Sequence, residues 1–558
     1  MSKVRWPCGC ELPVKSCSDT PMVINVEFGD TLPKGIELDV YSMNLNCEAT
    51  WDMICSGRTK GVFQLESALG RQWAKKLEPR SIEELGALGA LLRPGCLRAM
   101  SGNPPKSMTQ RYCDRKHGVE QVVYPHESLE PILKKTQGVL TFQEQAMKIA
   151  VVLAGFNEQQ ADILRKAIGK KKADLMEKVK KFFLEGAEKQ SIVTKEIAEE
   201  IFSWIEKSNR YAFNKSHAVS YAINAYWSAY CKTHRLKKFY NTYLNRADRK
   251  PDPDVEKKQL IMDAKRANID VLPPRLQHLY TNFTRNTEKD IVYYGLQHIK
   301  HVGGKECEKL ETLGNVSEYT WLDCLLKIIY KLNLNKRSTI ALISVGAFNG
   351  ANNRESRQKM LYEFDSWKQL SAREQKAIAE NHESGDPSVY ASSLSEAISH
   401  MTNTIKINSR RMPTVQDIKE SLDSPFYDLG DKAVTIAADE EKYMSCSLTC
   451  NKVDGLDLNM VTNLCQDVSS GVITKKANLA IEIVRVKIVK TKRGKNPGQE
   501  MAFLTVEDGS GSLEDVVIFP EPYDKYKDLL LDNNTVLLMG EVDKRKKTSF
   551  IVNQVSQI

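Results

Sequence analysis

The apolar pattern of this chain changes once, near Ala477, and this change constrains the fold more than any other feature. Before that point, apolar residues recur every three or four positions, which places them on one face of an α-helix. After it, Leu479 to Lys490 alternates apolar and polar residues, as a half-buried strand does. Because 558 residues are too many for one core, we expect about three to five domains, helical first and β-rich last.

The β-rich end predicts a five-stranded barrel. Four further strands follow the first one, over Met501 to Val506, Leu513 to Ile518, Thr535 to Gly540 and Phe550 to Val555. A helix is predicted near Tyr523 to Leu531, after the third strand. This order is typical of an OB-fold, which commonly binds single-stranded nucleic acid. The hairpin after the first strand carries Lys492, Arg493 and Lys495, which suit phosphate contacts. OB-folds also serve as protein-interaction modules, and that alternative stays open.

The run Tyr211-Ala-Phe-Asn-Lys-Ser-His217 opens a predicted helix whose apolar residues Val219, Ile223, Tyr226 (or Trp227) and Tyr230 have helical spacing. Asn214 or Ser216 stands where an N-cap belongs. Lys215 and His217 then lie at the positive end of the helix, where the first amides have no partner within it. That arrangement suits a polyphosphate or a nucleic-acid backbone. An ordinary capped helix with an exposed lysine fits these residues equally well.

A second cationic stretch, Leu164-Arg-Lys-Ala-Ile-Gly-Lys-Lys-Lys172, precedes that run by about forty residues. It overlaps a helix predicted over Asn157 to Ile168 and stopped by Gly169 as a C′ glycine. Two more helices are predicted after it, with one apolar face each. The faces comprise Leu175, Met176, Val179, Phe182 and Phe183 in one helix, and Ile197, Ile201, Trp204 and Ile205 in the other. We expect both faces to belong to the core.

A glycine turn between two helical elements forms a third candidate phosphate site. The stretch Val292 to Gly304 leads into an amphipathic helix over about Lys305 to Leu313, and Asn335 to Phe348 predicts a helical element beside it. Gly303 and Gly304 would let backbone amides approach a phosphate closely, as in a helix-hairpin-helix. A plain glycine-capped turn is the alternative. The preceding segment, Arg249 to Val255, is interrupted by prolines and is predicted to be a linker.

Composition narrows the classes of protein. No apolar run reaches the roughly 20 residues of a membrane span, and the N-terminal residues lack a signal-peptide core, so we expect a cytoplasmic protein with no membrane partner. The net charge of +9 fits polyanion binding but does not establish it. Thirteen scattered cysteines indicate reduced thiols. Cys8, Cys10 and Cys17 are weak candidates for a zinc site that would need a fourth ligand.

Together these pieces resemble the C-terminal part of bacterial replicative DNA polymerase III α subunits, which form family C. Each matching run is a weak signal alone, but the runs occur in the order and spacing of that family. They are Gly61-Val-Phe-Gln-Leu-Glu-Ser67, Leu92-Arg-Pro-Gly95, Asp114-Arg-Lys-His-Gly118, Gly138-Val-Leu-Thr-Phe-Gln-Glu-Gln145, Gly169-Lys-Lys-Lys172, Phe213-Asn-Lys-Ser-His217 and Leu272-Pro-Pro274. The resemblance covers roughly residues 45–350 and 435–558.

The resemblance implies a multidomain α+β protein, mostly helical through fingers and a helix-hairpin-helix region and ending in a five-stranded OB-fold barrel. We expect a Cys- and Pro-rich segment at 1–60 that borders a missing palm, and polymerase fingers at 61–247. A helix-hairpin-helix region that binds duplex DNA would follow at 248–350. A helical or irregular connector at 351–470 and an OB-fold at 476–558 would complete the chain.

The resemblance also implies roles for particular residues. The groups expected near the phosphates of an incoming dNTP are Arg165, Lys166, Lys215 and His217, with Arg93 as a weaker candidate. Cations and amides of this kind neutralise the charge that develops as pyrophosphate leaves. The groups expected to contact DNA are Lys170, Lys171, Lys172, Lys300, Gly303, Gly304, Lys492, Arg493 and Lys495.

The sequence departs from the family where catalysis should occur. Polymerases hold two Mg²⁺ ions about 4 Å apart on carboxylates, which in this family come from a palm that precedes the fingers. Only about 60 residues precede the fingers here. Asp252 and Asp254 have Asp-x-Asp spacing but lie in the predicted linker, where a solvated turn is the simpler interpretation. Asp39 is a weak candidate for the third aspartate.

We therefore expect the fingers-to-OB portion of a split DNA-directed DNA polymerase, of a kind that a phage could encode. A separate palm-bearing polypeptide would hold most of the Mg²⁺ ligands, and primer-template DNA and dNTPs would be the other partners. A sliding clamp is a further candidate partner, although the polar segment carries no clear motif for one. The alternative is a non-catalytic DNA-binding protein built from helix-hairpin-helix and OB modules.

Overall fold

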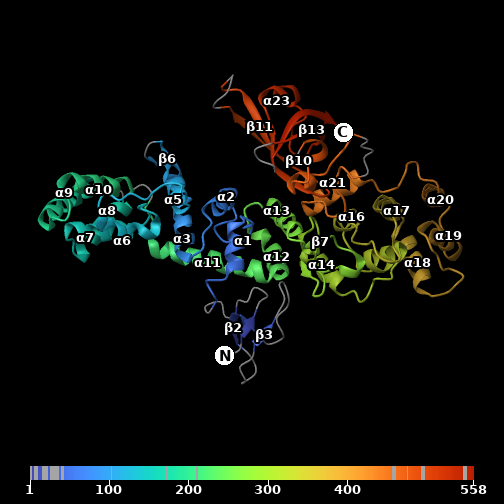
Figure 1. The fold of residues 1–558 in the computed structure, drawn as a ribbon. Coiled ribbons are helices and arrows are strands. Elements are labelled where there is room, and N and C mark those ends of the chain that lie inside the picture. The colour runs from blue at the N-terminus through green and yellow to red at the C-terminus, as the bar shows by residue number, and fades with distance from the viewer. Residues whose placement is uncertain are drawn as a thin grey trace. The chain divides into compact units, whose positions relative to one another are not determined.

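The computed structural model describes residues 3–5, 11–15, 23–25, 37–38, 43–101, 104–170, 173–208, 212–454, 460–473, 475–491, 497–543 and 549–558. The chain divides into two compact units, Met1–Tyr243 and Leu244–Ile558. Figure 1 shows a helical first unit and a second unit in which helices precede a barrel. Among the described residues, no helix is both long and apolar enough to span a membrane. All ten described cysteines are free thiols, as the sequence predicted.

Unit 1 begins with four short strands, β1 (Lys3–Arg5), β2 (Glu11–Lys15), β3 (Val23–Asn25) and β4 (Glu37–Leu38). Their order in the sheet is β3-β1-β2-β4, with β1 and β3 parallel. Helix α1 (Glu48–Cys55) follows, within the segment 1–60 that was predicted to be Cys- and Pro-rich.

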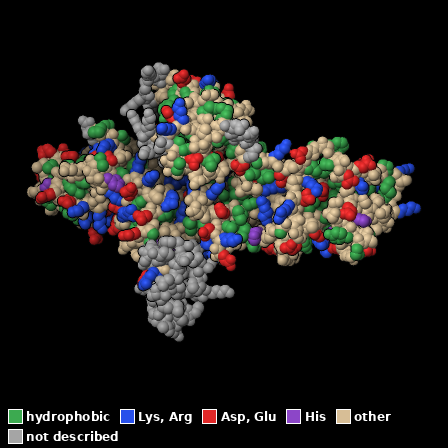
Figure 2. Space-filling view, turned by 45° about the vertical axis from the view of Figure 1, so that its right-hand side comes forward, with side chains coloured by type: hydrophobic (Ala, Val, Ile, Leu, Met, Phe, Trp, Pro, Cys, Tyr) green, Lys and Arg blue, Asp and Glu red, His purple; other side chains and the backbone are tan. Residues whose placement is uncertain are grey.

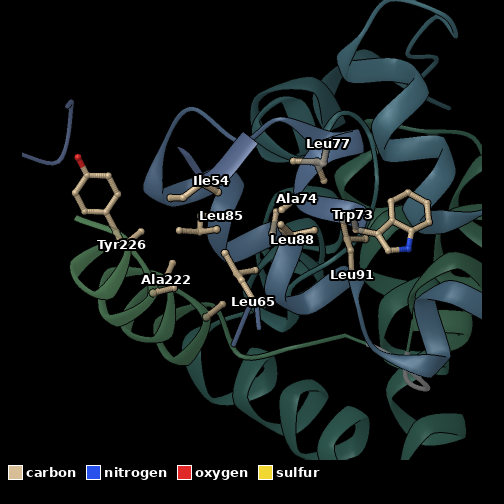
Figure 3. Packing of buried hydrophobic residues seen from close by; sticks show 14 of the residues in the cluster. Ile54, Leu65, Trp73, Ala74, Leu77, Leu85, Leu88, Leu91, Ala222 and Tyr226 are labelled. Carbon is tan, nitrogen blue, oxygen red and sulfur yellow. The ribbon is translucent and has the colours of Figure 1, made fainter. Parts of the chain in front are cut away.

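The first core of unit 1 joins two stretches that are distant in sequence. The first stretch contains α1, α2 (Ala68–Leu77), α3 (Ile82–Leu91), α4 (Pro94–Arg98), the short pair β5 (Met100–Ser101) and β6 (Lys106–Ser107), and α5 (Met108–Lys116). The second stretch is α11 (Lys215–His234). Figure 3 shows side chains of both stretches in one cluster, with Leu65 and Leu85 toward Ala222 and Leu88 beside Ala74.

The buried face of α11 differs from the predicted one. Its buried side chains include a stripe of four alanines at positions 218, 222, 225 and 229, whereas Val219 and Ile223 are only partly buried. Helix α11 packs against α3 here: a Cβ atom at Gly86 would lie 3.4 Å from the Ala218 carbonyl oxygen, which is ordinary van der Waals contact. Small side chains line this side of α11. Sequence reasoning that looked for large apolar residues missed the stripe.

The second core of unit 1 is continuous in sequence. It is built from η2 (Glu127–Leu129), α6 (Glu130–Leu133), η3 (Lys134–Thr136), α7 (Gln143–Ala154), α8 (Glu158–Lys170), α9 (Ala173–Gln190) and α10 (Lys195–Ser208). Two predictions are wrong here. Helix α8 continues through Gly169 to Lys170, so this glycine does not end the helix. Phe182 is 57% exposed, because α9 buries Val179 and Phe183 on a narrower face. Helix α12 (Leu236–Leu244) follows α11.

Unit 2 opens with a helix where a linker was predicted. The Asp252 side chain caps α13 (Pro253–Arg266) by accepting a hydrogen bond from the Val255 amide, and Pro253 occupies the first turn, where proline is tolerated. Short elements follow: β7 (Asp270–Leu272), η5 (Leu276–His278), β8 (Thr284–Arg285), β9 (Ile291–Tyr293) and η6 (Leu296–His298). The strands form a sheet of order β7-β9-β8. Then come α14 (Gly304–Glu311), α15 (Trp321–Asp323), η7 (Cys324–Tyr330) and α16 (Lys336–Ser344).

The connector is helical and is fixed by a buried ion pair. Its helices are α17 (Arg357–Gln369), α18 (Ala372–Glu383), α19 (Leu394–Thr404), α20 (Met412–Asp423), α21 (Ala433–Met444) and α22 (Cys465–Ser469). Arg357 Nη2 lies 2.8 Å from Glu440 Oε1, with side chains 4% and 0% exposed. Arg357 Nη1 also donates to the Ser344 carbonyl at the end of α16. On the face drawn in Figure 2, charges of both signs are interspersed over the helical regions.

The C-terminal region forms the closed barrel that the sequence predicted. Its strands are β10 (Lys476–Lys490), β11 (Glu500–Asp508), β12 (Gly511–Ile518), β13 (Thr535–Val542) and β14 (Phe550–Gln557), in the order β10-β11-β12-β14-β13. The long β10 closes the barrel because its first half pairs with β13 and its second half with β11. Helix α23 (Pro520–Tyr526) follows the third strand, starting earlier than expected. The multidomain α+β fold class, with a five-stranded terminal barrel, is confirmed.

Candidate nucleotide and nucleic-acid interface

The N-terminus of α11 presents two polar side chains to solvent. Of the two caps that the sequence left open, Asn214 is the one used: its Oδ1 accepts a hydrogen bond of 2.8 Å from the His217 amide. Lys215 and His217 are both exposed in the first turn. A cation and an imidazole therefore lie at the positive end of a 20-residue helix, where an anion is stabilised by the helix dipole.

A carboxylate also lies at this helix end, and sequence reasoning missed it. Glu144, in the first turn of α7, accepts hydrogen bonds of 2.9 Å from the Lys215 amide and from Asn214 Nδ2. The Glu144 carboxylate therefore partly occupies the place where an anion would bind at this helix N-terminus. Glu144 and Asn214 are 70 residues apart in sequence, so no local pattern links them.

Arg93 reaches the same region through Phe213. The Phe213 amide donates to the Thr141 carbonyl at 3.0 Å, and the Phe213 carbonyl accepts from the Gln143 amide at 2.9 Å. These bonds fix the Phe213 ring, and the Arg93 guanidinium carbon lies 3.7 Å from its centroid, a cation–π distance. The His217 ring also neighbours it, at 5.2 Å between centroids. The structure thus groups Arg93 with Phe213 and His217.

Arg165 and Lys166 belong to a different part of unit 1. Both lie on α8, in the second core, and their contacts are with Asp162 of the same helix. Arg165 Nη2 and Lys166 Nζ each lie 2.8 Å from a carboxylate oxygen of Asp162. Hydrogen bonds from Lys166 and then Arg165 lower the pKa of Asp162, so this carboxylate offsets the two cations. The residues predicted to bind phosphate therefore form two groups, one at the α11 N-terminus and one on α8. None of the contacts described above links the two groups.

Several predicted site residues lie outside the described residues: Asp39, Cys8, Cys10, Cys17, Lys171, Lys172, Lys492, Arg493 and Lys495. Lys170 ends α8, and its side chain is not described. Within the described ranges, no three His, Cys, Asp or Glu side chains are grouped so that they could hold a metal ion.

The glycine turn before α14 has an open backbone. Gly303 is the N-cap of the helix and Gly304 its first residue. A Cβ atom built at either position would meet no described atom within 4 Å. Packing inside the chain therefore does not require glycine at these positions, and their amides can be approached from outside. An exposed glycine pair at a helix start is suited to a phosphate ligand.

Lys300, three residues before this turn, is held by an acidic partner. Its Nζ lies 3.2 Å from Asp254 Oδ2, and its side chain is about half exposed. Asp254 also accepts a hydrogen bond of 2.6 Å from Ser445 Oγ. That hydrogen bond and Lys300 lower the pKa of Asp254. Asp254 therefore has a structural role, which agrees with treating the Asp-x-Asp spacing as coincidental. Lys300 keeps a solvent-facing side.

The barrel carries a basic and aromatic strip that sequence reasoning did not single out. Lys487 of β10 lies directly opposite Phe503 of β11. Both side chains are exposed, as is Arg485, which lies two positions earlier on the same face. Aromatic rings and cations side by side are what single-stranded nucleic-acid platforms use. The period-two alternation could have revealed this strip, because it places Arg485 and Lys487 on one outward face.

Family models match three regions of the chain in order. A model described as the bacterial DNA polymerase III alpha subunit finger domain matches residues 25–191. A helix-hairpin-helix motif model matches residues 268–360. A model of an OB-fold nucleic-acid-binding domain matches residues 482–558. The three matches thus follow the order of fingers, hairpin and barrel.

Curated relatives match most of this chain, and each is named DNA polymerase III subunit alpha. The protein from Aquifex aeolicus is 31% identical over 532 residues, which is 93% of this chain and 40% of the relative. The Escherichia coli O6:H1 protein is 32% identical over 90% of this chain and 41% of its own length. The Borreliella burgdorferi protein is 29% identical over 96% and 43%. The chain thus spans about two fifths of the length of these relatives.

Proposed function

Because the chain corresponds to the C-terminal portion of a bacterial DNA polymerase III alpha subunit, with its finger, helix-hairpin-helix and OB-fold parts, we propose that it binds primer-template DNA and an incoming dNTP during DNA replication. The observation that carries this proposal is the exposed N-terminus of α11, where Lys215 and His217 stand free of the core and Arg93 lies close by. An anion bound there would meet a helix dipole and positive side chains together.

The chemistry of this helix end suits phosphoryl transfer. Fixed cations and amides stabilise the charge that develops on a leaving pyrophosphate, because they are already oriented before reaction. Lys215 and Arg93 are the groups we assign to the phosphates, with His217 beside them. Arg165 and Lys166 form a second cationic group on α8 that we assign to the nucleic-acid backbone or to the same phosphates.

Duplex and single-stranded DNA would contact unit 2. The open amides of Gly303 and Gly304, with Lys300 nearby, suit the phosphates of a duplex backbone. Phe503, Lys487 and Arg485 on the barrel suit an unpaired strand. Contacts of this kind release counterions from DNA, so affinity should fall steeply as the salt concentration rises.

We further propose that the carboxylates that hold the catalytic Mg²⁺ ions come from a separate palm-bearing polypeptide, as in a split enzyme encoded by a phage. In the Aquifex aeolicus relative, the match to this chain covers two fifths of the length, and the other three fifths lie outside it. Magnesium supplies charge neutralisation and activation of the attacking oxygen in such enzymes. We assign none of that chemistry to the described residues, which carry no grouped metal ligands.

The test of nucleotide binding uses the chain assembled with a palm-bearing partner on a primed template. Lys215→Ala should lower the rate of dNTP incorporation about 10²-fold, the typical loss when one stabilising group is removed. Lys181→Ala, at an exposed lysine of α9, is the matched control and should leave the rate unchanged. An unchanged rate in Lys215→Ala would overturn the assignment. DNA affinity indifferent to dNTP and Mg²⁺ would favour a non-catalytic DNA-binding protein.

The split is tested by the size of the natural polypeptide and by the polypeptides that copurify with it. Affinity purification from its source should give a polypeptide of about the 63.2 kDa of this sequence together with a second one that carries an Asp-x-Asp palm. A single larger polypeptide with its own palm would overturn the split and leave the nucleotide-binding proposal standing. A sliding clamp in the same preparation would identify the remaining candidate partner.

A further inference from the structure

The loop Gly61–Ser67, which resembles the family in sequence but has no role so far, is fixed firmly against unit 1. Val62 and Leu65 are buried at 0% and 2% exposure, and Figure 3 shows Leu65 among the core side chains. Thr59 Oγ1 donates to the Leu65 carbonyl at 2.8 Å. Lys232 Nζ donates to two carbonyls just before the loop, each at 2.8 Å. The loop is therefore a rigid support.

Phe63 is the residue that this support presents to solvent. Its side chain is 40% exposed, although its neighbours Val62 and Leu65 are buried. Gly61 and Gln64 on either side have φ values of 75° and 63°, in the left-handed region that a residue such as Gln64 rarely adopts. The Phe63 amide donates to Ser228 Oγ of α11 at 3.0 Å. A phenylalanine held outward at a conformational cost is typical of a functional position.

The Phe63 ring begins a row of rings along α11. Its centroid lies 5.2 Å from that of Tyr221, which is 38% exposed. The Tyr221 ring lies 4.1 Å from the His217 ring, and His217 lies 5.2 Å from Phe213. The Arg93 guanidinium carbon lies 3.7 Å from the Phe213 ring centroid. The row therefore has exposed aromatic rings at one end and cations at the other.

We infer that Phe63 and Tyr221 form a stacking site for a nucleobase whose phosphates lie toward Lys215 and Arg93. A nucleotide matches this row, because its aromatic base can stack on the exposed rings while its anionic phosphates lie toward the cations. Base–aromatic stacking tolerates any base, because every base has a π-face. The site deepens the proposed function and rests on it. Its ligand chemistry, a nucleobase joined to phosphate, is shared by an incoming dNTP and by an unpaired template base.

The test measures binding of two fluorescent probes to the full chain. One probe is 2-aminopurine deoxyribonucleoside triphosphate, and the other is a single-stranded oligonucleotide with one central 2-aminopurine. Stacking quenches this base, so wild-type protein should quench at least one probe. Phe63→Ala should weaken binding of that probe about 5- to 100-fold, the usual effect of losing one stacking ring, and should abolish the quenching. Phe63→Trp should keep both.

Phe182→Ala is the matched control, because Phe182 is 57% exposed on α9 and should not affect either probe. The source of the base follows from which probe is quenched: the triphosphate alone indicates the incoming nucleotide, and the oligonucleotide alone indicates the template strand. Both outcomes support the stacking site.

Two results would overturn the stacking site: wild-type protein that quenches neither probe, or Phe63→Ala that binds and quenches as wild type does. Thermal unfolding of Phe63→Ala should match that of wild type, because the ring is outside the core, and so a loss of binding would not reflect misfolding. The proposed function fails separately, if Lys215→Ala leaves incorporation on a primed template unchanged. The two failures are therefore distinguishable.

Discussion

The two units use their cationic side chains in different ways. In unit 1, Lys215 at the start of α11 is exposed; its own backbone amide donates to the Glu144 carboxylate, and the Glu83 carboxylate lies within electrostatic range of its charge. In unit 2, Arg357 and Glu440 bury their charges almost completely against each other. The first arrangement leaves a charge available to a ligand, and the second consumes both charges in holding helices together. A basic residue is thus not evidence of DNA binding until its partners are known.

The largest expected effect comes from breaking the buried pair. Glu440→Ala should lower the free energy of unfolding of unit 2 by about 3–5 kcal/mol, because it leaves the Arg357 guanidinium buried without a counter-charge. It also removes the acceptor of the Leu448 and Thr449 amides, which lie 2.6 and 2.8 Å from Glu440 Oε2. Urea denaturation followed by hydrogen exchange of unit 2 measures the loss.

An apolar replacement of both partners is the control for that experiment. Arg357→Met combined with Glu440→Leu should cost less than Glu440→Ala alone, since the Arg357 guanidinium is then no longer buried without its partner. If Glu440→Ala lowered the free energy of unfolding by less than about 1 kcal/mol, the pair would behave like a surface ion pair. The two units would then not differ in how they use their cations.

The sequence could predict the barrel but not the buried Arg357–Glu440 pair. The barrel was predictable, because alternation is a local signal that Leu479 to Lys490 carries by itself. A cap at Asn214 or Ser216 was predictable for the same reason, and the structure uses Asn214. The Arg357–Glu440 pair joins residues 83 positions apart, and nothing near either one indicates the other. The alanine stripe of α11 was missed because the helix that it packs against, α3, is more than 120 residues away in the sequence.

The next effect concerns acid stability of unit 2. Burial alone would raise the pKa of Asp323, but hydrogen bonds from His382, Lys327 and Thr320 outweigh burial and hold this pKa well below its ordinary range. His382 Nε2 lies 3.0 Å and Lys327 Nζ 2.7 Å from Asp323 Oδ1. Because the folded-state pKa is depressed, the unfolded chain takes up this proton at higher pH. The stabilisation is therefore present above about pH 4 and declines as pH falls.

Asp323→Asn should remove this dependence. The variant should lose about 2 kcal/mol of unfolding free energy at pH 7, the usual range for hydrogen bonds to a charged group. The difference from wild type should shrink as pH falls from 5 toward 2. Denaturation curves at several pH values measure it. A difference that stays constant with pH would mean that Asp323 does not act through its charge.

The smallest effect tests the exposed cation of unit 1 through Glu144, the carboxylate that accepts a hydrogen bond from the Lys215 amide. Glu144→Gln keeps an acceptor for the Lys215 amide but removes the negative charge. Since a charge at a helix N-terminus is worth about 0.3–1 kcal/mol, stability should fall by at most that amount. Affinity for tripolyphosphate should rise about 2- to 5-fold by the same reasoning, and more at low salt. Isothermal titration with tripolyphosphate measures the change, and Glu177→Gln on α9 is the control. A weaker affinity in Glu144→Gln would mean that Glu144 orients the Lys215 terminus for its ligand, and that unit 1, like unit 2, depends on its carboxylate to place a cation.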